Sequence, residues 1–310
     1  MLSLTFVTLQ RLFGEDLSSN RSMHPLFRTA WLFCFWITPF FCFGIITACH
    51  PAWAASVAST AKKDDHALSG TVLIPADIRG LSCLASSLSE VVLMAHPSPG
   101  WRAWSIANLV KHAYGVQAFE AEQIELVDPE AAKDKRLEAI RSLRLAKEAG
   151  WTHMKRIDLS AAAAASDDLD LAYWTAAAWG ALISLDRDDF DALADWPKAK
   201  ALADWVRREK ADFADGAALV LAASFEFSSP GGDKAQAKRW FAEALEKYGE
   251  KQAMLHVLLA QQLDLDTGDR RGFEARLRLA LQVADAYPGF ENRVAASKAR
   301  WLLHRVDALF

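Results

Sequence analysis

The stretch GGDKAQAKRWFAEAL, residues 231–245, carries the pattern that decides the fold. Within it Ala237, Phe241 and Ala244 stand at offsets of zero, four and seven residues. These offsets fall on one stripe of an α-helix, where two small residues let a neighbouring helix approach closely and the bulky residue fills the groove between them. Asp233 follows two glycines and is a good N-cap, so it predicts that the helix begins there.

The same small–bulky–small pattern returns elsewhere in the chain. The further copies, two of them weaker than the first, are Ala139/Leu143/Ala146, Phe273/Leu277/Ala280 and Ala199/Ala203/Val206. In chain order the copies are about 60, 38 and 36 residues apart, and the last two steps are close to the 34-residue tetratricopeptide unit. The sequence therefore predicts an all-α fold, in which residues 69–310 form an array of tetratricopeptide-like helical hairpins.

Helix-favouring residues fill this region, and no segment alternates in the manner of a strand. The breaks carry turn residues, for example HPSPG at 96–100 and SSPGGD at 228–233. The predicted helices span 77–95, 101–122, 129–149, 170–185, 196–210, 213–227, 233–248, 251–264, 269–286 and 290–309. The last one is amphipathic, and we expect it to cap the array with a polar outer face.

The N-terminal region has the layout of a secretory signal peptide. No charged residue occurs between Thr29 and Ala61, a basic residue precedes this run, and small residues follow it. ITAC at 46–49 fits a bacterial lipobox, which predicts a signal peptide over 1–49, with its true start at Met1 or Met23, and lipid on Cys49. Residues 50–68 are small, polar and mixed, as in a tether.

Two other interpretations of the N-terminus stay open. The motif AWA ending at Ala54 fits ordinary signal cleavage, which would release a soluble periplasmic protein. The apolar run over 30–49 is also long enough to serve as an uncleaved membrane anchor.

Motifs for catalysis, metals and nucleotides are missing from the sequence, so we predict no catalytic residues, cofactor or metal. Ser59 and Lys62 have the spacing of a serine acylase but lack its companion motifs. The segments 264–269 and 186–189 are acidic, and both are most simply polar turns because a calcium loop needs its glycine and glutamate elsewhere. The net charge is −4 without a basic cluster, which argues against nucleic acid.

The stretch AYWTAAAWGALISL, residues 172–185, contains no charge and is apolar on every side when drawn as a helix. Such a helix is enclosed by neighbours. Tyr173, Trp174 and Trp179, together with Trp301 of the last helix, are candidates to line a ligand cavity with apolar walls and a few polar groups. Packing in the core explains the same four residues, and the sequence leaves both interpretations open.

Three stretches together resemble the TatT family, the tetratricopeptide-like components of TRAP transporter systems. They are YWTAAAWGALISL at 173–185, GGDKAQAKRWFAEAL at 231–245 and KARWLLHRVDALF at 298–310, with looser similarity over most of 67–310. The resemblance implies a non-enzymatic, exported lipoprotein of the periplasm. It also implies association with the TRAP solute-binding protein, and a small hydrophobic or organic-acid ligand held in a cavity or pore.

Other functions are compatible with the same features. A general scaffold, tethered to the envelope and built for protein–protein assembly, would need the same signal peptide and helical repeats. A hydrolase with an unrecognised site is a third hypothesis. Homo-oligomers are compatible with all three, and the sequence does not name the solute or say which membrane holds the lipid.

Overall fold

Helices are the regular structure of the residues that this computed structural model describes, 74–160 and 165–310, and no strand occurs among them. The all-α prediction is therefore confirmed. None of these helices is long and apolar enough to cross a membrane. The predicted signal peptide, lipid site at Cys49, cleavage site at Ala54 and tether lie outside the described residues.

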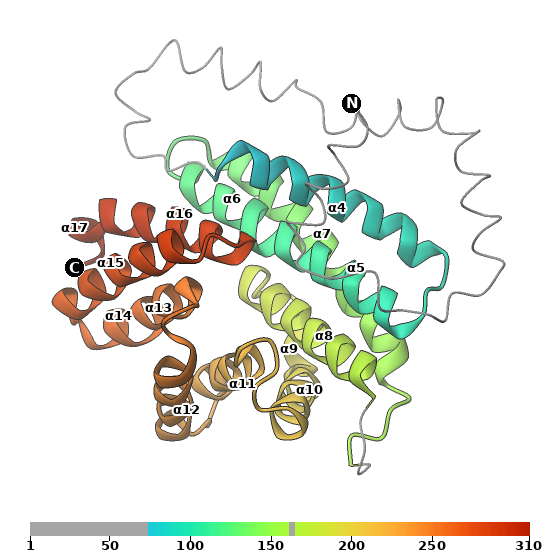
Figure 1. The fold of residues 1–310 in the computed structure, drawn as a ribbon. Helices are drawn as coiled ribbons and strands as arrows, with labels where there is room; N and C mark the ends of the chain where they lie inside the picture. The colour runs from blue at the N-terminus through green and yellow to red at the C-terminus, as the bar shows by residue number, and fades with distance from the viewer. Residues whose placement is uncertain (1–73, 161–164) are drawn as a thin grey trace. The chain divides into compact units, whose positions relative to one another are not determined.

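The helices follow one another with short connections (Figure 1). In the first half they are α4 (Ala76–Met94), α5 (Pro99–His112), the π-helix η1 (Ala113–Gln117), α6 (Ala118–Ile124), α7 (Pro129–Met154), α8 (Ser166–Leu185) and α9 (Phe190–Ala194). In the second half they are α10 (Trp196–Glu209), α11 (Ala217–Ser228), α12 (Lys234–Tyr248), α13 (Ala253–Leu259), the π-helix η2 (Ala260–Asp264), α14 (Leu265–Thr267), α15 (Arg270–Ala286), α16 (Phe290–His304) and α17 (Val306–Leu309). The ten predicted helices match these within about five residues, although the short helices α9 and α14 were not predicted.

Aspartate side chains start four of the helices. Asp233 accepts the backbone N–H of Gln236 at 2.8 Å, as the sequence predicted for α12. Asp128, Asp189 and Asp269 do the same for α7, α9 and α15. Each cap satisfies a backbone donor that the first helical turn leaves without a partner.

All four copies of the small–bulky–small pattern lie in the core. Every residue of the four triads is almost completely buried: Ala139, Leu143, Ala146, Ala199, Ala203, Val206, Ala237, Phe241, Ala244, Phe273, Leu277 and Ala280. The helices that carry them pack against their neighbours, α7 and α10 against α8, α12 against α11, and α15 against α13 and α16. The predicted helix contacts are present, whereas a tetratricopeptide-like arrangement of the hairpins remains a prediction.

Helix α7 continues past the residue where the sequence predicted its end. The predicted helix ended at residue 149, but α7 runs on through Gly150 to Met154. The glycine permits a close approach to α8, because a Cβ atom built on Gly150 would lie 2.0 Å from the Oγ1 atom of Thr175. Thr175 is fully buried, and its hydroxyl donates to the carbonyl of Leu171 at 2.6 Å.

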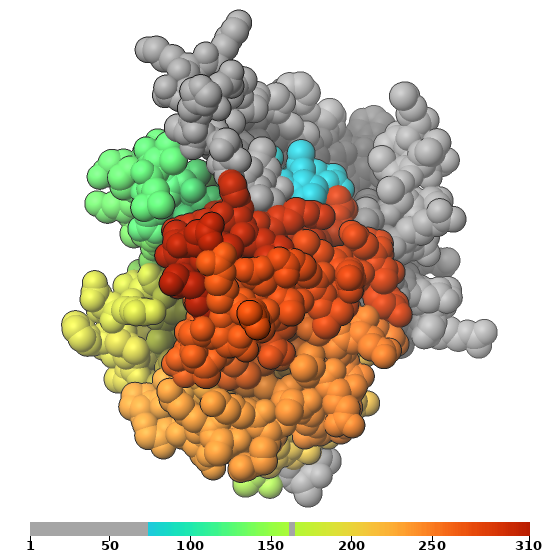
Figure 2. All heavy atoms as spheres, turned by 90° about the vertical axis from the view of Figure 1, so that its left-hand side faces the viewer, coloured from blue at the N-terminus to red at the C-terminus, as the bar shows by residue number. Residues whose placement is uncertain are grey.

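The sequence predicted that the last long helix caps an open end of the array. The structure differs, because this helix has neighbours on more than one side. Its consecutive residues 294–297 are all buried, so more than one side of α16 is covered. α16 packs on α13 and α15, and it also shares a core with Val116 of η1 and Phe119 of α6. The C-terminal helices gather on one face of the unit that residues 67–310 form (Figure 2).

Replacing Gly150 by alanine tests the close approach of α7 and α8. We expect Gly150→Ala to lower the free energy of unfolding by about 1–3 kcal/mol, because the added methyl group overpacks a fixed neighbour. Gly80→Ala in α4 is the matched control, since no atom lies within 4 Å of the added Cβ. The control should raise stability by about 0.5–1 kcal/mol, as alanine favours helix over glycine. Chemical denaturation of both variants measures this, and equal effects would contradict the contact.

Candidate functional site

Two of the four candidate residues lie together and are partly accessible. Tyr173 and Trp174 occupy adjacent positions in the first half of α8, and their rings meet edge to face with centroids 5.0 Å apart. Both side chains are half-buried. Phe213, from the turn between α10 and α11, packs on the other side of Tyr173 with a centroid distance of 4.9 Å. These rings form one apolar wall.

The other two candidates are core residues. Trp179 is fully buried and packs against Trp151 of α7 at a centroid distance of 5.4 Å. Trp301 is 8% exposed and packs against Phe119 of α6 at 5.7 Å. Both pairs are edge-to-face contacts of the kind that stabilise a core. A ligand could reach these two indoles only by displacing packed side chains.

A lysine and a glutamate complete the accessible cluster around Trp174. Lys111, at the end of α5, places its Nζ atom 2.9 Å from the Oε1 atom of Glu291 in the first turn of α16. The same ammonium lies 5.4 Å from the ring centroid of Trp174 and 6.0 Å from that of Phe290. The ammonium of Lys111 therefore contacts one carboxylate and two aromatic rings. The carboxylate and the faces of the rings all attract positive charge. We call Lys111, Tyr173, Trp174, Phe290 and Glu291 the α5–α8–α16 cluster.

The pKa values in this cluster are shifted by burial and by the ion pair. Burial raises the pKa of Glu291, but the charge and the hydrogen bond of Lys111 outweigh it, so the net pKa lies below the usual range. Burial raises the pKa of Tyr173 strongly, and the negative charge of Glu291 raises it further. Tyr173 is therefore a neutral hydroxyl group in the physiological range, able to donate a hydrogen bond.

A π-helical turn connects the cluster to the rest of the fold. η1 begins two residues after Lys111, and its Gly115 faces α16, where an added Cβ would lie 3.9 Å from Val294 and 4.0 Å from Phe290. Because a π-turn inserts an extra residue, it changes the direction of the side chains that follow it, and such turns are frequent at functional sites. η1 thus adjoins both Lys111 and α16.

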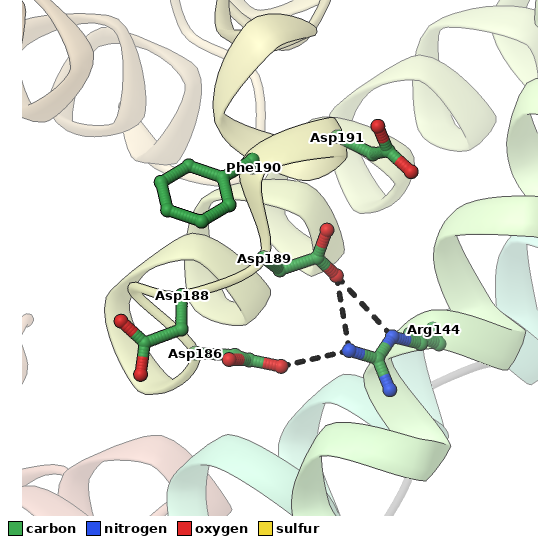
Figure 3. A pocket seen from close by; sticks show the side chains of 6 residues that line it. All are labelled: Arg144, Asp186, Asp188, Asp189, Phe190 and Asp191. Carbon is green, nitrogen blue, oxygen red and sulfur yellow. Dashed lines mark hydrogen bonds and ion pairs between the residues drawn. The ribbon is translucent and has the colours of Figure 1, made fainter.

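Away from this cluster, a polar hollow of about 530 Å³ lies where α7 meets the turn before α9 (Figure 3). Arg144 donates to Asp186 at 2.7 Å and to Asp189 at 3.0 Å. Asp189 is the N-cap of α9, and the hydrogen bond from the backbone N–H of Ala192, together with Arg144, holds the pKa of Asp189 below its usual value. The hollow is open and its arginine is already paired with Asp186 and Asp189, so we assign it no ligand.

The acidic stretch 264–269 was predicted as a polar turn, but it is helical as far as Thr267 and turns only at residues 268–269. Asp264 accepts a hydrogen bond from Arg276 at 2.7 Å, Gly268 has a φ of 68°, and Asp269 caps α15. Among the described residues, no group of three or more His, Cys, Asp or Glu side chains could hold a metal ion. Ser59 and Lys62 lie outside the described residues.

Comparison with known families identifies the protein class. Residues 130–310, from α7 to the C-terminus, match the family described as TAtT, TRAP transporter T-component. The chain belongs to this family. No curated protein matches it. In this T-component the matched range includes Tyr173, Trp174, Phe290 and Glu291, whereas Lys111 lies before it.

Sequence reasoning about this T-component missed the polar part of the cluster. Lys111 and Glu291 are far apart in the chain and belong to no motif, so only the packing of α5 against α8, and of η1 against α16, brings them together. Phe290 follows a Pro-Gly turn, which predicted the start of a helix but not the contact of its ring with Lys111. An aromatic cluster without charge was the only signal that pointed to this place.

The ion pair makes stability depend on pH in a defined direction. A carboxyl group whose pKa is lowered by folding contributes stability above its ordinary value, 4.5 for Glu291, and loses it as the pH falls through the folded pKa. We therefore expect the wild type to lose more stability than Glu291→Gln between about pH 6 and about pH 3. Thermal unfolding at several pH values measures this.

The same comparison in a Lys111→Met background is the control. Without the lysine, the pH profiles measured with and without the Glu291→Gln substitution should approach each other, because the interaction that lowers the pKa is gone. If the wild type and Glu291→Gln lose stability in parallel as the pH falls while Lys111 is present, the ion pair is contradicted.

Proposed function

We propose that this T-component is a non-enzymatic, lipid-tethered protein of the periplasm that serves a TRAP-type uptake system. In this proposal it binds the solute-binding protein of the system and holds a small organic acid in the α5–α8–α16 cluster. Family membership over residues 130–310 is the observation that carries the proposal. Sequence features add support, because an apolar N-terminal run with a lipobox precedes the helical region.

The chemistry of the cluster supports an organic acid with an apolar part. Lys111 supplies an ammonium group that is 34% exposed, and its partner Glu291 is 57% exposed. A carboxylate ligand would compete with Glu291 for the ammonium through charge-assisted hydrogen bonds. The rings of Trp174 and Phe290 offer apolar faces, and the neutral hydroxyl of Tyr173 offers a donor.

The partner should be the solute-binding protein, because that is the soluble component which a periplasmic T-component would meet. A lipid on Cys49 would keep the helical unit close to the membrane that holds the permease. The alternative is a general envelope scaffold, whose partners would belong to an assembly machine. The two functions differ in the protein that is bound, so the partner decides between them.

Affinity capture from cells tests the partner. The full chain, solubilised in mild detergent after crosslinking in vivo, should recover a TRAP solute-binding protein in stoichiometric amounts. A deletion strain should also take up the corresponding solute more slowly. Recovery of envelope-assembly proteins, with normal uptake in the deletion strain, would favour the scaffold and reject the transporter role.

Calorimetric titration with mono- and dicarboxylates of different alkyl chain length tests the ligand site. Lys111→Met should weaken carboxylate binding by about tenfold or more, since a hydrogen bond to a charged group contributes about 1.5–3 kcal/mol. Trp174→Ala should weaken the longer ligands most, because it removes an apolar wall. Phe190→Ala is the control, as this exposed aromatic belongs to the Arg144 hollow.

Folding must be checked for each variant before binding is interpreted. Removal of a packed aromatic side chain costs up to about 3–5 kcal/mol, which unfolds a marginal protein. Circular dichroism and the thermal midpoint show whether the variants retain the fold. Unchanged carboxylate binding in folded Lys111→Met and Trp174→Ala proteins would remove the cluster from the proposal.

A further inference from the structure

The first described helix, α4, exposes a row of large apolar side chains. Its exposed side carries Leu81, Leu84, Leu88, Val91 and Met94, with exposed fractions from 36% to 77%. We call these five residues the α4 stripe. Its buried side carries Ile78 and Leu93 near the two ends, but serines at 82, 86 and 89 between them. Helices on the surface of a protein normally bury leucine and expose serine, so the stripe needs an explanation.

A buried serine joins α4 to α5 in this orientation. Ser82 lies 3.0 Å from Nδ1 of the buried His112 in α5, whereas Ser89 donates within α4 to the carbonyl of Ala85 at 2.7 Å. Their small side chains also let α4 lie close to α5, its main neighbour. If α4 turned its leucines inward, the contact between Ser82 and His112 would be lost and larger side chains would have to fit. The packing of the serine side of α4 against α5 therefore leaves the stripe facing outward.

Charge is scarce along the exposed side of α4. The helix contains three charged residues, Asp77, Arg79 and Glu90. Asp77 forms an ion pair with Arg293 of α16 at 2.8 Å, and Arg79 lies 3.6 Å from Glu120 of α6. An exposed apolar patch of this kind marks a site of interaction. Because the face carries so little charge, it is more stable in contact with an apolar surface than with water.

The flanks of the stripe distinguish between a second helix and a bilayer. A helix that pairs with another helix usually borders its apolar seam with charged residues, which select the partner. Here most bordering positions, Gly80, Ala85, Ser87 and Val92, are uncharged, and the exposed charges beside the stripe are the two carboxylates of Asp77 and Glu90. Trp101, 56% exposed in the first turn of α5, lies just beyond the end of α4. Tryptophan favours the boundary between lipid and water.

The position of α4 in the chain also favours a bilayer. The uncharged apolar run ends at Cys49, and residues 50–75 lead from there into α4. A chain of this length spans at most about 90 Å, whatever its conformation. If Cys49 carries lipid, α4 is therefore held within reach of the membrane surface, where even a modest apolar contact becomes effective.

We propose that the α4 stripe rests on the membrane surface, with its leucine, valine and methionine side chains among the lipid acyl chains. The helix lies in the plane of the interface and does not span the bilayer. This proposal depends on the lipid tether of the proposed function. The contact would orient the helical unit relative to the membrane. The tether alone leaves the unit free to rotate, whereas a second contact through α4 fixes which side faces the membrane.

Photocrosslinking identifies what covers the stripe. The full chain is expressed in its own cells with the photoreactive amino acid p-benzoylphenylalanine in place of Leu88, irradiated, and analysed by mass spectrometry. The expected product is an adduct with membrane phospholipid, which differs in mass from the lipid on Cys49. The same substitution at Leu279 of α15, which is 43% exposed, is the control and should give no lipid adduct.

Other products at position 88 would overturn the proposal. A crosslinked dimer would show that a second copy covers the stripe, and a crosslink to residues 1–73 would show that the chain covers itself. A crosslink to another protein, or no adduct at all, would equally reject the bilayer contact. The N-terminal fragment in the same sample reports whether Cys49 is acylated, so failure of the tether is distinguished from failure of the stripe.

A charged variant separates binding from chance proximity to the membrane. With the photoreactive residue at Val91, the double substitution Leu84→Glu and Leu88→Glu should abolish the lipid adduct, because carboxylates are excluded from the acyl region. Both positions are exposed, so circular dichroism and the thermal midpoint should not change. Lipid adducts that persist in this variant would reject the stripe as the contact, whereas capture of the solute-binding protein tests the proposed function separately.

Discussion

The packing of α16 against η1 and α6 is the contact on which the arrangement of this unit depends. It joins the last long helix to the first helices of the described region through Val116, Phe119 and Trp301. Ion pairs between Asp77 and Arg293, and between Lys111 and Glu291, border the same contact. Without it, α16 would end the array as a solvent-exposed helix and Glu291 would lie far from α8.

Small residues set how closely the helices approach one another. The alanines of the repeated pattern, and Gly150 facing Thr175, remove the volume that would keep neighbouring axes apart. The aromatic residues of α8 then fill the remaining space unevenly. Trp179 points into the core, whereas Tyr173 and Trp174 reach a place that water also reaches, which is why the candidate site lies at one end of an otherwise enclosed helix.

The two proposals concern different sides of the same N-terminal helices. α5 contributes Lys111 to the cluster with α8 and α16, and it also supports α4, whose leucines face outward. Both sites include residues before position 130, where the family match begins. The matched region supplies the aromatic wall and Glu291, whereas the cation and the apolar stripe belong to the part of the chain that the match does not cover.

Sequence alone determined the helices and much of their packing, because helix propensity, aspartate caps and the offsets of Ala237, Phe241 and Ala244 are local properties of the chain. It did not determine where α7 ends, since Gly150 is required by Thr175 in another helix and not by a turn. It also pointed to four aromatic candidates without separating the buried from the accessible ones. Only the tertiary structure decided that Trp179 and Trp301 are packed and that Lys111 meets Glu291 and Trp174, because these contacts depend on how distant helices cross.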